Sequence, residues 1–434
     1  MRVGVPVSQQ SSTASPTTST GRSCQRAASS ANLTPPCLPD SNRNILQHHN
    51  IACDNCRIER ADVAMIGGGM AGLSLAAELA ELDSRMVARV EAAGGHREPL
   101  RIMVLERENQ FGYHTTGRSV AAFLESYGTP EVRALTRASR TILDALGAES
   151  GTPLLRARPL VWIAGEEQLP AMNALLTANP ALRGTDVAGA QTLCPALRPS
   201  AVARAAVERT AQDIDVDALH QLYRKRAAAA GVVLRTAIGL EAGEWTGRGW
   251  RLTTDRGELE AERVVNAAGA WADAVAGRLG VAAAGLKPLR RTVAIVSIEG
   301  VAPGWPLVHD VGDEFYFRPE GGGLLVSPCD ETPSPPVDAV AAPEDVALGV
   351  ERVAAVTTLD LRRVRTSWAG LRTFAPDRNP VVGPDPVQDG FYWFAGQGGS
   401  GIQTAPALAR LGAAELLGEP FEIPGLRRGA LHPR

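Results

Sequence analysis

The 434-residue sequence contains no apolar run that approaches the roughly 20 residues needed to span a membrane as a helix. It also lacks a basic surplus: lysine and arginine total 44, aspartate and glutamate total 47, and the formal net charge is −3. Proteins that bind nucleic acids or anionic membranes through charge carry such a surplus. We therefore expect no membrane span and no nucleic-acid partner.

Cysteine is scarce beyond residue 56, where only Cys194 and Cys329 occur. Cys53 and Cys56 form a C-x-x-C pair within an otherwise polar stretch. A metal site needs a complete ligand set on a folded frame, so we predict no metal here. The cysteine content favours a reduced, cytoplasmic protein.

Acidic residues are absent before Asp40. Residues 1–60 are rich in Ser, Thr, Pro, Gln and Asn, a composition that buries too little apolar surface to fold. We predict a disordered extension over residues 1–60; a targeting segment and a misassigned start are the alternatives. The chain as a whole is 44% hydrophobic and 21% charged, and its length suffices for two or three domain cores.

A glycine-rich turn organises the folded part. Residues 61–66 form a short apolar run typical of a buried parallel strand, and residues 73–80 are rich in helix formers. Between them, Gly67 permits a sharp turn, Gly69 a close approach to a pyrophosphate, and Gly72 close packing of helix on strand. The helix start presents free N–H groups to phosphates. This pattern predicts a dinucleotide site.

Such a unit needs an acid at the end of its second strand to bind ribose hydroxyls. Residues 102–105 form the only strong strand pattern nearby and are followed by Glu106. Glu106 lies 34 residues past Gly72, against the usual roughly 20, which predicts an inserted helix extension and loop over residues 85–99. The alternative is a glycine turn in an ordinary α/β core.

Three further stretches fit a ligand crevice. Residues 115–119 offer hydroxyls, N–H groups and one cation after the second strand, with a solvated loop as the alternative. Residues 263–271 run from a strand into a small-residue turn, where the backbone passes close to a flat or bulky group. Residues 391–395 form a strand that leads through a second glycine turn into helix 405–417, which aims a second helix dipole at a ligand.

Alternating aspartates at Asp213, Asp215 and Asp217 precede a predicted helix. Their spacing lacks the glycine and glutamate of a calcium loop, so Asp217 is interpreted as the helix N-cap. Strand-like stretches between residues 293 and 326, separated by turn residues, predict an antiparallel sheet in a second domain.

Together these motifs resemble the D-amino-acid oxidase family of FAD enzymes, over about residues 62–404, and within it most closely the bacterial D-arginine dehydrogenases. The resemblance implies an α/β fold: a Rossmann-like FAD-binding domain with a second, mostly antiparallel α+β substrate domain. The expected boundaries are 61–155, 206–287 and 365–425 for the FAD-binding domain, and 156–205 and 288–364 for the substrate-binding domain.

The resemblance implies FAD as the cofactor. The FAD would be noncovalent, because residues 368–374 lack the cysteine to which some relatives attach flavin. The pyrophosphate would meet Gly67, Gly69, Met70, Ala71 and Gly72, the adenosine Glu106 and Arg107, and the flavin Thr115, Thr116, Gly117, Arg118, Ser119 and Val120. The adenine and ribitol would meet Gly239, Ala268, Gly269 and Trp271, and the pyrimidine edge Gly399, Gly401, Ile402, Gln403 and Thr404. A nicotinamide-dependent dehydrogenase or a nonenzymatic binding module is the alternative.

The resemblance also implies a substrate carboxylate clamped by Arg291 and Arg372. The planar guanidinium suits this task because it binds a carboxylate through two parallel hydrogen bonds. Arg290 could take the place of Arg291, since neighbouring residues of a strand face opposite sides. The alternative interpretation is that Arg291 is an ordinary surface arginine and that Tyr127 and Tyr316 only pack in the core. The expected catalytic residues are Arg291 and Arg372, Tyr127 and Tyr316 closing over the substrate, and Gly399, whose carbonyl orients the amine.

The sequence departs from the D-arginine dehydrogenases where the substrate side chain binds. Leu160 stands in place of a glutamate, Ala122 of a histidine, Leu307 of a methionine and His309 of a valine. The missing carboxylate removes a partner worth about 1.5–3 kcal/mol to a cationic side chain. The resemblance thus implies hydride transfer from a D-amino acid with a neutral or apolar side chain to flavin N5, giving an imino acid that hydrolyses to a keto acid and ammonia. Glycine, sarcosine or a 2-hydroxy acid are alternative substrates, and the electron acceptor is left open.

Overall fold

The computed structural model describes residues 58–434. The predicted N-terminal extension and the Cys53–Cys56 pair lie outside these residues, except that β1 (Glu59–Ile66) begins two residues before the expected domain boundary. The described residues form one compact unit. Among residues 58–434, no helix combines the length and apolar composition that crossing a bilayer requires.

An eight-stranded sheet carries the glycine turn. Its parallel centre has the order β9-β2-β1-β12-β20, and the other three strands join it antiparallel. All of β2 and the last four residues of β1 are buried because both faces of the sheet are covered there. The strands after β1 are β2 (Ile102–Leu105), β9 (Val233–Arg235), β10 (Leu240–Trp245), β11 (Trp250–Thr254), β12 (Gly257–Asn266), β19 (Val381–Pro384) and β20 (Phe391–Ala395).

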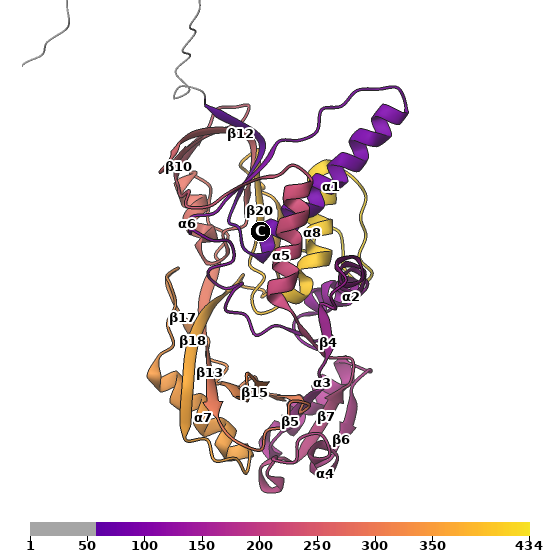
Figure 1. Cartoon of the computed structure of the whole chain (residues 1–434), viewed down its shortest axis with the longest axis vertical. Coiled ribbons are helices and arrows are strands. Elements are labelled where there is room, and N and C mark those ends of the chain that lie inside the picture. Colours follow the sequence, from indigo (N-terminus) through magenta and orange to yellow (C-terminus); the bar gives the residue numbers. More distant parts are fainter. Residues whose placement is uncertain (1–57) are drawn as a thin grey trace, which may run out of the picture. The chain divides into compact units, whose positions relative to one another are not determined.

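Four helices pack together on one face of this sheet: α1 (Met70–Ala92), α2 (Pro130–Ser150), α5 (Val216–Ala229) and α8 (Gly401–Leu417). Figure 1 shows α1, α5 and α8 side by side. On the opposite face, α6 (Ala272–Arg278) packs against a core that contains Trp250 of β11 and Trp393 of β20. The 23 residues of α1 explain why Glu106 lies so far beyond Gly72.

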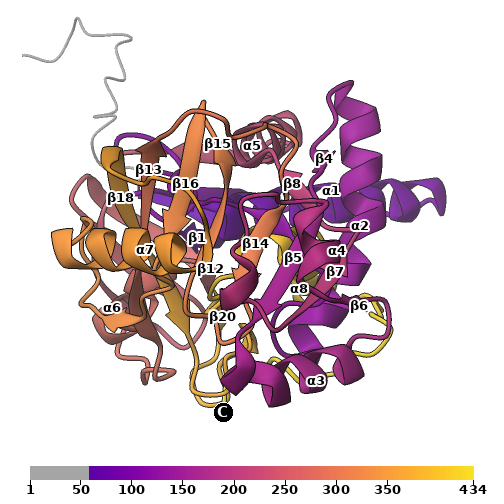
Figure 2. The same ribbon diagram turned by 90° about the horizontal axis from the view of Figure 1, so that it is seen from below.

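A nine-stranded sheet forms the lower half of Figure 1. All its strand pairs are antiparallel except β5 with β14, which confirms the expected mostly antiparallel second domain. Figure 2 shows α7 (Pro343–Val356) lying across β13 and β16, and it contacts both. The strands are β5 (Leu160–Ala164), β6 (Arg183–Thr185), β7 (Arg204–Glu208), β13 (Lys287–Ser297), β14 (Leu307–Asp310), β15 (Tyr316–Glu320), β16 (Gly323–Ser327), β17 (Thr332–Pro333) and β18 (Arg363–Phe374). The smaller helices are α3 (Leu169–Ala178), α4 (Val187–Gln191) and the 3-10 turns η2 (Glu166–Gln168), η3 (Pro199–Ala201) and η4 (Gly269–Trp271).

Two of the expected domain boundaries fall inside strands of this sheet. β7 continues past residue 205 to pair with β5 and β6, and β18 pairs with β13 on both sides of residue 364. The first five residues of β18 are exposed. Because these residues are exposed, the alternation of apolar residues in the sequence does not show that β18 begins at Arg363.

A three-stranded sheet of order β3-β8-β4 lies beside the larger two: β3 (Ala122–Phe123), β4 (Leu155–Ala157) and β8 (Gln212–Ile214). The helix α5 that follows β8 is capped by Asp215, whose Oδ1 accepts from the Ala218 N–H at 3.0 Å. The expected cap, Asp217, is wrong: it lies in the first turn of the helix, so its carboxylate is past the capping position. Asp213 instead accepts from Arg158 and Arg318.

Candidate active site

One cavity extends from the glycine turn of the eight-stranded sheet to the nine-stranded sheet. Gly67 and Glu106 line it at one end, and Leu307 and Arg318 at the other. Most of the glycine turn, the 115–120 loop and the start of α8 border it between these ends. The predicted crevice at the carboxyl ends of parallel strands therefore continues into the second sheet.

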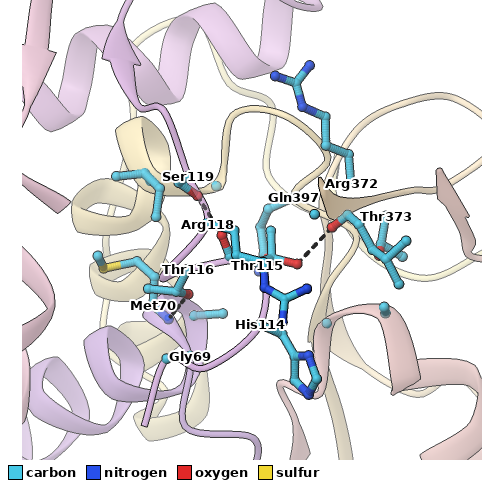
Figure 3. Close-up of a pocket in the computed structure, with 18 of the residues that line it drawn as sticks. Gly69, Met70, His114, Thr115, Thr116, Arg118, Ser119, Arg372, Thr373 and Gln397 are labelled. Carbon is cyan, nitrogen blue, oxygen red and sulfur yellow. Dashed lines mark hydrogen bonds between the residues drawn. The ribbon is translucent and has the colours of Figure 1, made fainter. Parts of the chain in front are cut away.

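The glycine turn has the close contacts that its residues predict. Gly67 has a φ of +108°, and a Cβ on it would lie 2.5 Å from the Ala267 carbonyl oxygen. A Cβ on Gly72 would lie 1.9 Å from the Gly67 carbonyl oxygen, so Gly72 packs α1 against the turn. The Met70 N–H donates to Thr116 Oγ1 at 2.9 Å, which ties the helix start to the next loop (Figure 3).

Glu106 directly follows β2, as predicted. Its Oε2 accepts from the Gly68 N–H and its Oε1 from the Glu108 N–H, each at 2.9 Å. His220 of α5 supports the same turn, because its Nε2 lies 3.2 Å from the Gly68 carbonyl. Burial lowers the pKa of His220, so the neutral ring donates this hydrogen bond. No local pattern in the sequence pointed to His220 beyond its place in a predicted helix.

The 115–120 loop is fastened to the second sheet. Thr115 Oγ1 donates to the Leu371 carbonyl at 2.8 Å, and Ser119 Oγ donates to the Thr115 carbonyl at 2.7 Å (Figure 3). The Arg118 guanidinium donates to the Ala339 and Ala369 carbonyls and pairs with Asp338. It is therefore committed to these groups instead of being free for an anionic ligand.

The second glycine turn leads into α8 at Gly401. Gln403 Oε1 accepts from the Leu124 N–H at 2.9 Å and faces the cavity. Thr404 is fully buried and does not line the cavity, and its Oγ1 is satisfied within the helix by donating to the Ser400 carbonyl at 2.9 Å.

The lining fits a long ligand with several hydrogen-bonding groups. Within residues 58–434, the buried atoms His114 Nδ1, Thr373 Oγ1 and Gln403 Nε2 have no hydrogen-bond partner, and all three residues line the cavity. A buried polar atom without a partner costs about 1–3 kcal/mol, so a ligand that supplies partners is stabilised here. The N-termini of α1 and α8 both open onto the same space and favour anionic or electron-rich groups. These features suit a flavin dinucleotide.

Arg291, and not Arg290, lies in the cavity wall. Arg291 is 4% exposed; its Nε donates to the Asp330 carbonyl at 3.0 Å and its Nη2 lies 3.4 Å from Glu331 Oε1. Its buried Nη1 has no partner in the described part of the chain. Arg290 turns the other way and donates to Asp345 of α7 at 2.6 Å.

The guanidinium group of Arg372 has no hydrogen bond or ion pair to any residue between 58 and 434. It lies against Gly399, since a Cβ on that glycine would sit 3.0 Å from Arg372 Nη1 and 3.1 Å from Cζ. In Figure 3 its guanidinium points away from His114 and the 115–120 loop. Two guanidinium groups with unused donors thus border one cavity.

Aromatic rings surround His309 beside these arginines. Its ring stacks on Tyr316 at 5.5 Å between centroids and lies 6.2 Å from Tyr127. Burial lowers the pKa of His309, and its Nδ1 lies 2.9 Å from the Asp310 carbonyl, so the neutral ring donates from Nδ1. Burial raises the pKa of the Tyr127 hydroxyl, which stays protonated at neutral pH.

Three potential metal-ligand atoms, of His309, Asp313 and Cys329, lie within 4.8 Å of one another. Arg291 Nη2 lies 3.9 Å from Asp313 Oδ2. Burial by itself would lower the pKa of Arg291, but Cys329, Asp313 and the neighbouring tyrosines together raise it above its usual value, so its charge persists. A guanidinium this close opposes a divalent cation, and Asp313 serves as a partner of Arg291 instead.

The structure brings most of the predicted site residues to this cavity. The exceptions are Gly72 and Thr404, treated above, Gly117, which packs on the Gly112 carbonyl, and Gly239, whose N–H donates to Asp255 at 3.0 Å. Those that line it are the catalytic candidates Tyr127, Arg291, Tyr316, Arg372 and Gly399, and the cofactor candidates Gly67, Gly69, Met70, Ala71, Glu106, Arg107, Thr115, Thr116, Arg118, Ser119, Val120, Ala268, Gly269, Trp271, Gly401, Ile402 and Gln403.

The substrate end differs from the expectation at one position. Ala122, Leu307 and His309 line the cavity, but Leu160 is fully buried in the core behind it. Sequence reasoning also missed several lining residues, among them His114, Thr373 and Arg318. His114 directly precedes the predicted flavin loop, and this position could have identified it as a lining residue.

Comparison with known proteins agrees with the geometry. The DAO family model, described as FAD dependent oxidoreductase, matches residues 62–415. FAD-dependent oxidoreductase domain-containing protein 1 of Bos taurus is 27% identical over 417 residues, covering 84% of this chain and 82% of that protein. Glycine oxidase of Pseudomonas aeruginosa is 27% identical over 396 residues, covering 83% of this chain and 96% of that protein. The solved structure of L-proline dehydrogenase from P. horikoshii shares the fold, with a TM-score of 0.74 at 18% identity, covering 87% of this chain and 98% of that one. This chain belongs to the DAO family of FAD dependent oxidoreductases, and its cofactor is FAD.

Proposed function

We propose that this enzyme oxidises the Cα–N bond of a D-amino acid whose side chain is neutral or apolar, in preference to D-arginine. The product is an imino acid, which hydrolyses to a keto acid and ammonia. FAD supplies the chemistry by accepting the hydride from the Cα. The proposal includes Met70, Ala71 and the other lining residues named above as the noncovalent FAD site.

One observation carries this proposal: Arg291 and Arg372 present unused guanidinium donors in the same cavity as the predicted flavin loop. A guanidinium binds a carboxylate through a planar fork, so a pair of them suits the carboxyl group of an amino acid. The Arg372 guanidinium lies against Gly399. The carboxylate and the amine would therefore be held at one place.

The remaining residues orient and enclose the substrate. The Gly399 carbonyl accepts a hydrogen bond from the neutral amine, and Tyr127 and Tyr316 cover the substrate and exclude water. The amine loses its proton before or during binding, so no side chain is required as a strong base. Holding the Cα–H bond in one orientation is the main contribution of the protein.

The side-chain end of the cavity supports a substrate that is not cationic. It is lined by Ala122, Leu124, Leu307 and Val293 together with Arg318, and none of these described residues is an acid. A cationic side chain would lose its hydration there without gaining a carboxylate partner.

Glycine or sarcosine is the second candidate substrate. The match to a Pseudomonas aeruginosa glycine oxidase over most of both chains favours it. The apolar lining beyond the arginines gives room for a side chain that glycine does not have, and this favours the first candidate.

Anaerobic bleaching of the flavin tests the proposal. The purified yellow protein is mixed without oxygen with single D- and L-amino acids, glycine, sarcosine and 2-hydroxy acids, and flavin absorbance is followed. We expect neutral D-amino acids to bleach the flavin faster than D-arginine and faster than their L-enantiomers. Bleaching by L-amino acids alone, by glycine and sarcosine alone, or by 2-hydroxy acids alone would overturn the proposal.

A further inference from the structure

Arg318 of β15 lies at the far end of the cavity and is 7% exposed. Its Nη1 donates to Asp213 Oδ1 at 2.5 Å and its Nη2 to Glu320 Oε2 at 2.8 Å. Its Nε is buried and has no acceptor among residues 58–434. Neither the carboxylate clamp nor the cofactor site uses this group.

The strand register aims Arg318 at the substrate. Alternate residues of a strand share a face, so Arg318 and Tyr316 lie on the same side of β15. Tyr316 pairs with His309 of the neighbouring β14, and Leu307 lies two residues before His309 on the same face. All four residues line the cavity. Their side chains form one wall, with aromatic rings near the arginine pair and a guanidinium farther along.

The spacing along this wall fits a side chain of moderate length. Two residues of a strand advance about 6.6 Å. Measured from its α-carboxylate to its terminal oxygen, a glutamate or glutamine spans about that distance, whereas alanine or serine falls short of it. A substrate held by its carboxylate near Tyr316 can therefore bring a terminal oxygen to Arg318.

The charge of Arg318 is only partly neutralised by Asp213. The same carboxylate also accepts from Arg158, through its Oδ2 at 2.5 Å. Asp213 and Glu320 together balance the charges of Arg158 and Arg318, but the buried Arg318 Nε remains a donor without an acceptor among residues 58–434. A side chain that ends in a hydrogen-bond acceptor can pair with this N–H, whereas an ammonium or guanidinium, which has donors alone, cannot.

We propose that Arg318 recognises the substrate side chain, and that the preferred substrates are amino acids whose side chain ends in a carboxamide or a carboxylate. This inference rests on the proposed oxidation of an amino acid at this site. It names a specificity residue, narrows the neutral side chains to those that end in a carboxamide, and adds the anionic carboxylate of glutamate to the proposed substrates.

The test compares glutamine and glutamate with norleucine, an apolar side chain of similar length, each in the enantiomer that bleaches the flavin. The readout is the ratio of second-order rate constants for anaerobic flavin reduction. We expect wild type to favour glutamine or glutamate by about tenfold or more. In Arg318→Met the ratio should fall to within about twofold of unity, because the terminal acceptor loses its donor.

Arg158→Met is the matched control. It removes the other guanidinium from Asp213 but not a cavity-lining residue, so the ratio should stay at the wild-type value. If Arg318→Met does not yield folded yellow protein, Ala122→Glu replaces it. Ala122 lines the cavity from β3, where it pairs with Asp213 of β8, and a carboxylate there would occupy the Arg318 donor and abolish the preference.

The outcomes separate the two proposals. If no amino acid, glycine or sarcosine bleaches the flavin, the proposed function itself fails. If amino acids bleach it but wild type shows no preference, or Arg318→Met keeps the preference, the inference about Arg318 is wrong. An equal loss in Arg158→Met would show that Arg318 acts only through Asp213, which also overturns it.

Discussion

The substitution Arg372→Met should reduce substrate binding without affecting folding, and it does so more cleanly than other substitutions at this site. The Arg372 guanidinium has no hydrogen-bonding or ionic partner in residues 58–434 and faces the cavity shared with Arg291. Removing it breaks no side-chain hydrogen bond or ion pair within the described chain and lowers the repulsion between two like charges. The free energy of unfolding should therefore change by no more than about 0.5 kcal/mol.

Substrate oxidation should respond very differently. A charge-assisted hydrogen bond to the substrate carboxylate contributes about 1.5–3 kcal/mol, which corresponds to about a 10- to 150-fold loss of kcat/KM. FAD should remain bound, because the predicted pyrophosphate contacts lie at the glycine turn. Steady-state kinetics, flavin absorbance and thermal denaturation of the same preparation measure the three quantities.

Arg365→Met is the control on the same strand. Arg365 is exposed and donates to the Gly321 carbonyl at 2.9 Å, so its loss should leave kcat/KM unchanged. An unchanged kcat/KM in Arg372→Met, with FAD still bound, would refute the carboxylate clamp. If kcat/KM fell only together with FAD content or thermal stability, Arg372 would be needed for folding or cofactor binding. That result would refute the argument that its guanidinium serves substrate binding alone.

Three further predictions follow from the same contacts. Gly72→Ala should give colourless or unfolded protein, because its Cβ would lie 1.9 Å from the Gly67 carbonyl oxygen, whereas Gly277→Ala in α6 meets nothing within 4 Å and should stay yellow; flavin absorbance decides, and a yellow Gly72→Ala protein contradicts the packing argument. Gly399→Ala should raise KM severalfold with FAD retained, because the new Cβ meets Arg372 Nη1 at 3.0 Å and must displace it; an unchanged KM would mean that Arg372 does not touch the substrate. Burial lowers the pKa of His220 and His309, so below about pH 6.5 the unfolded chain binds protons that the folded chain does not, and the free energy of unfolding should decrease as the pH falls. Thermal denaturation between about pH 8 and pH 5 measures this slope, which His220→Asn should flatten.

Local signals in the sequence were sufficient for the dinucleotide unit. Gly67, Gly69 and Gly72 are consecutive with the strand and helix that they join, so their roles follow from neighbours within a few residues. Glu106 was also found, despite its unusual distance, because β2 is short and wholly apolar. Such features are recognisable without knowing how distant segments pair.

The sequence was a poorer guide where the site depends on distant segments. Whether Gly239 borders the cavity depends on Asp255, whose carboxylate holds its N–H. Leu160 matched a pocket position by resemblance, yet the sheet buries it completely. Arg318 could not be recognised as a cavity residue from the sequence, because its orientation depends on a hydrogen bond to Asp213, which is 105 positions away. Pairwise contacts of this kind are absent from any single stretch of sequence.

The register of two strands decides whether the proposed clamp exists. β13 and β18 pair antiparallel, with Arg291 opposite Gly370 and Leu289 opposite Arg372. Arg372 lies two residues beyond Gly370, so both guanidinium groups project from the same face as diagonal neighbours. Gly370 opposite Arg291 has no side chain to fill the space between them.

A slip of one residue in β13 would turn every side chain of that strand to the other face. Arg290, which now donates to Asp345 of α7, would then enter the cavity, and Arg291 would face α7. The pairing of Arg290 with Asp345 opposes such a slip, because it would leave this partly buried carboxylate without its arginine. The contact on the far side of the sheet, remote from any substrate, therefore holds in place the residue that we propose binds it.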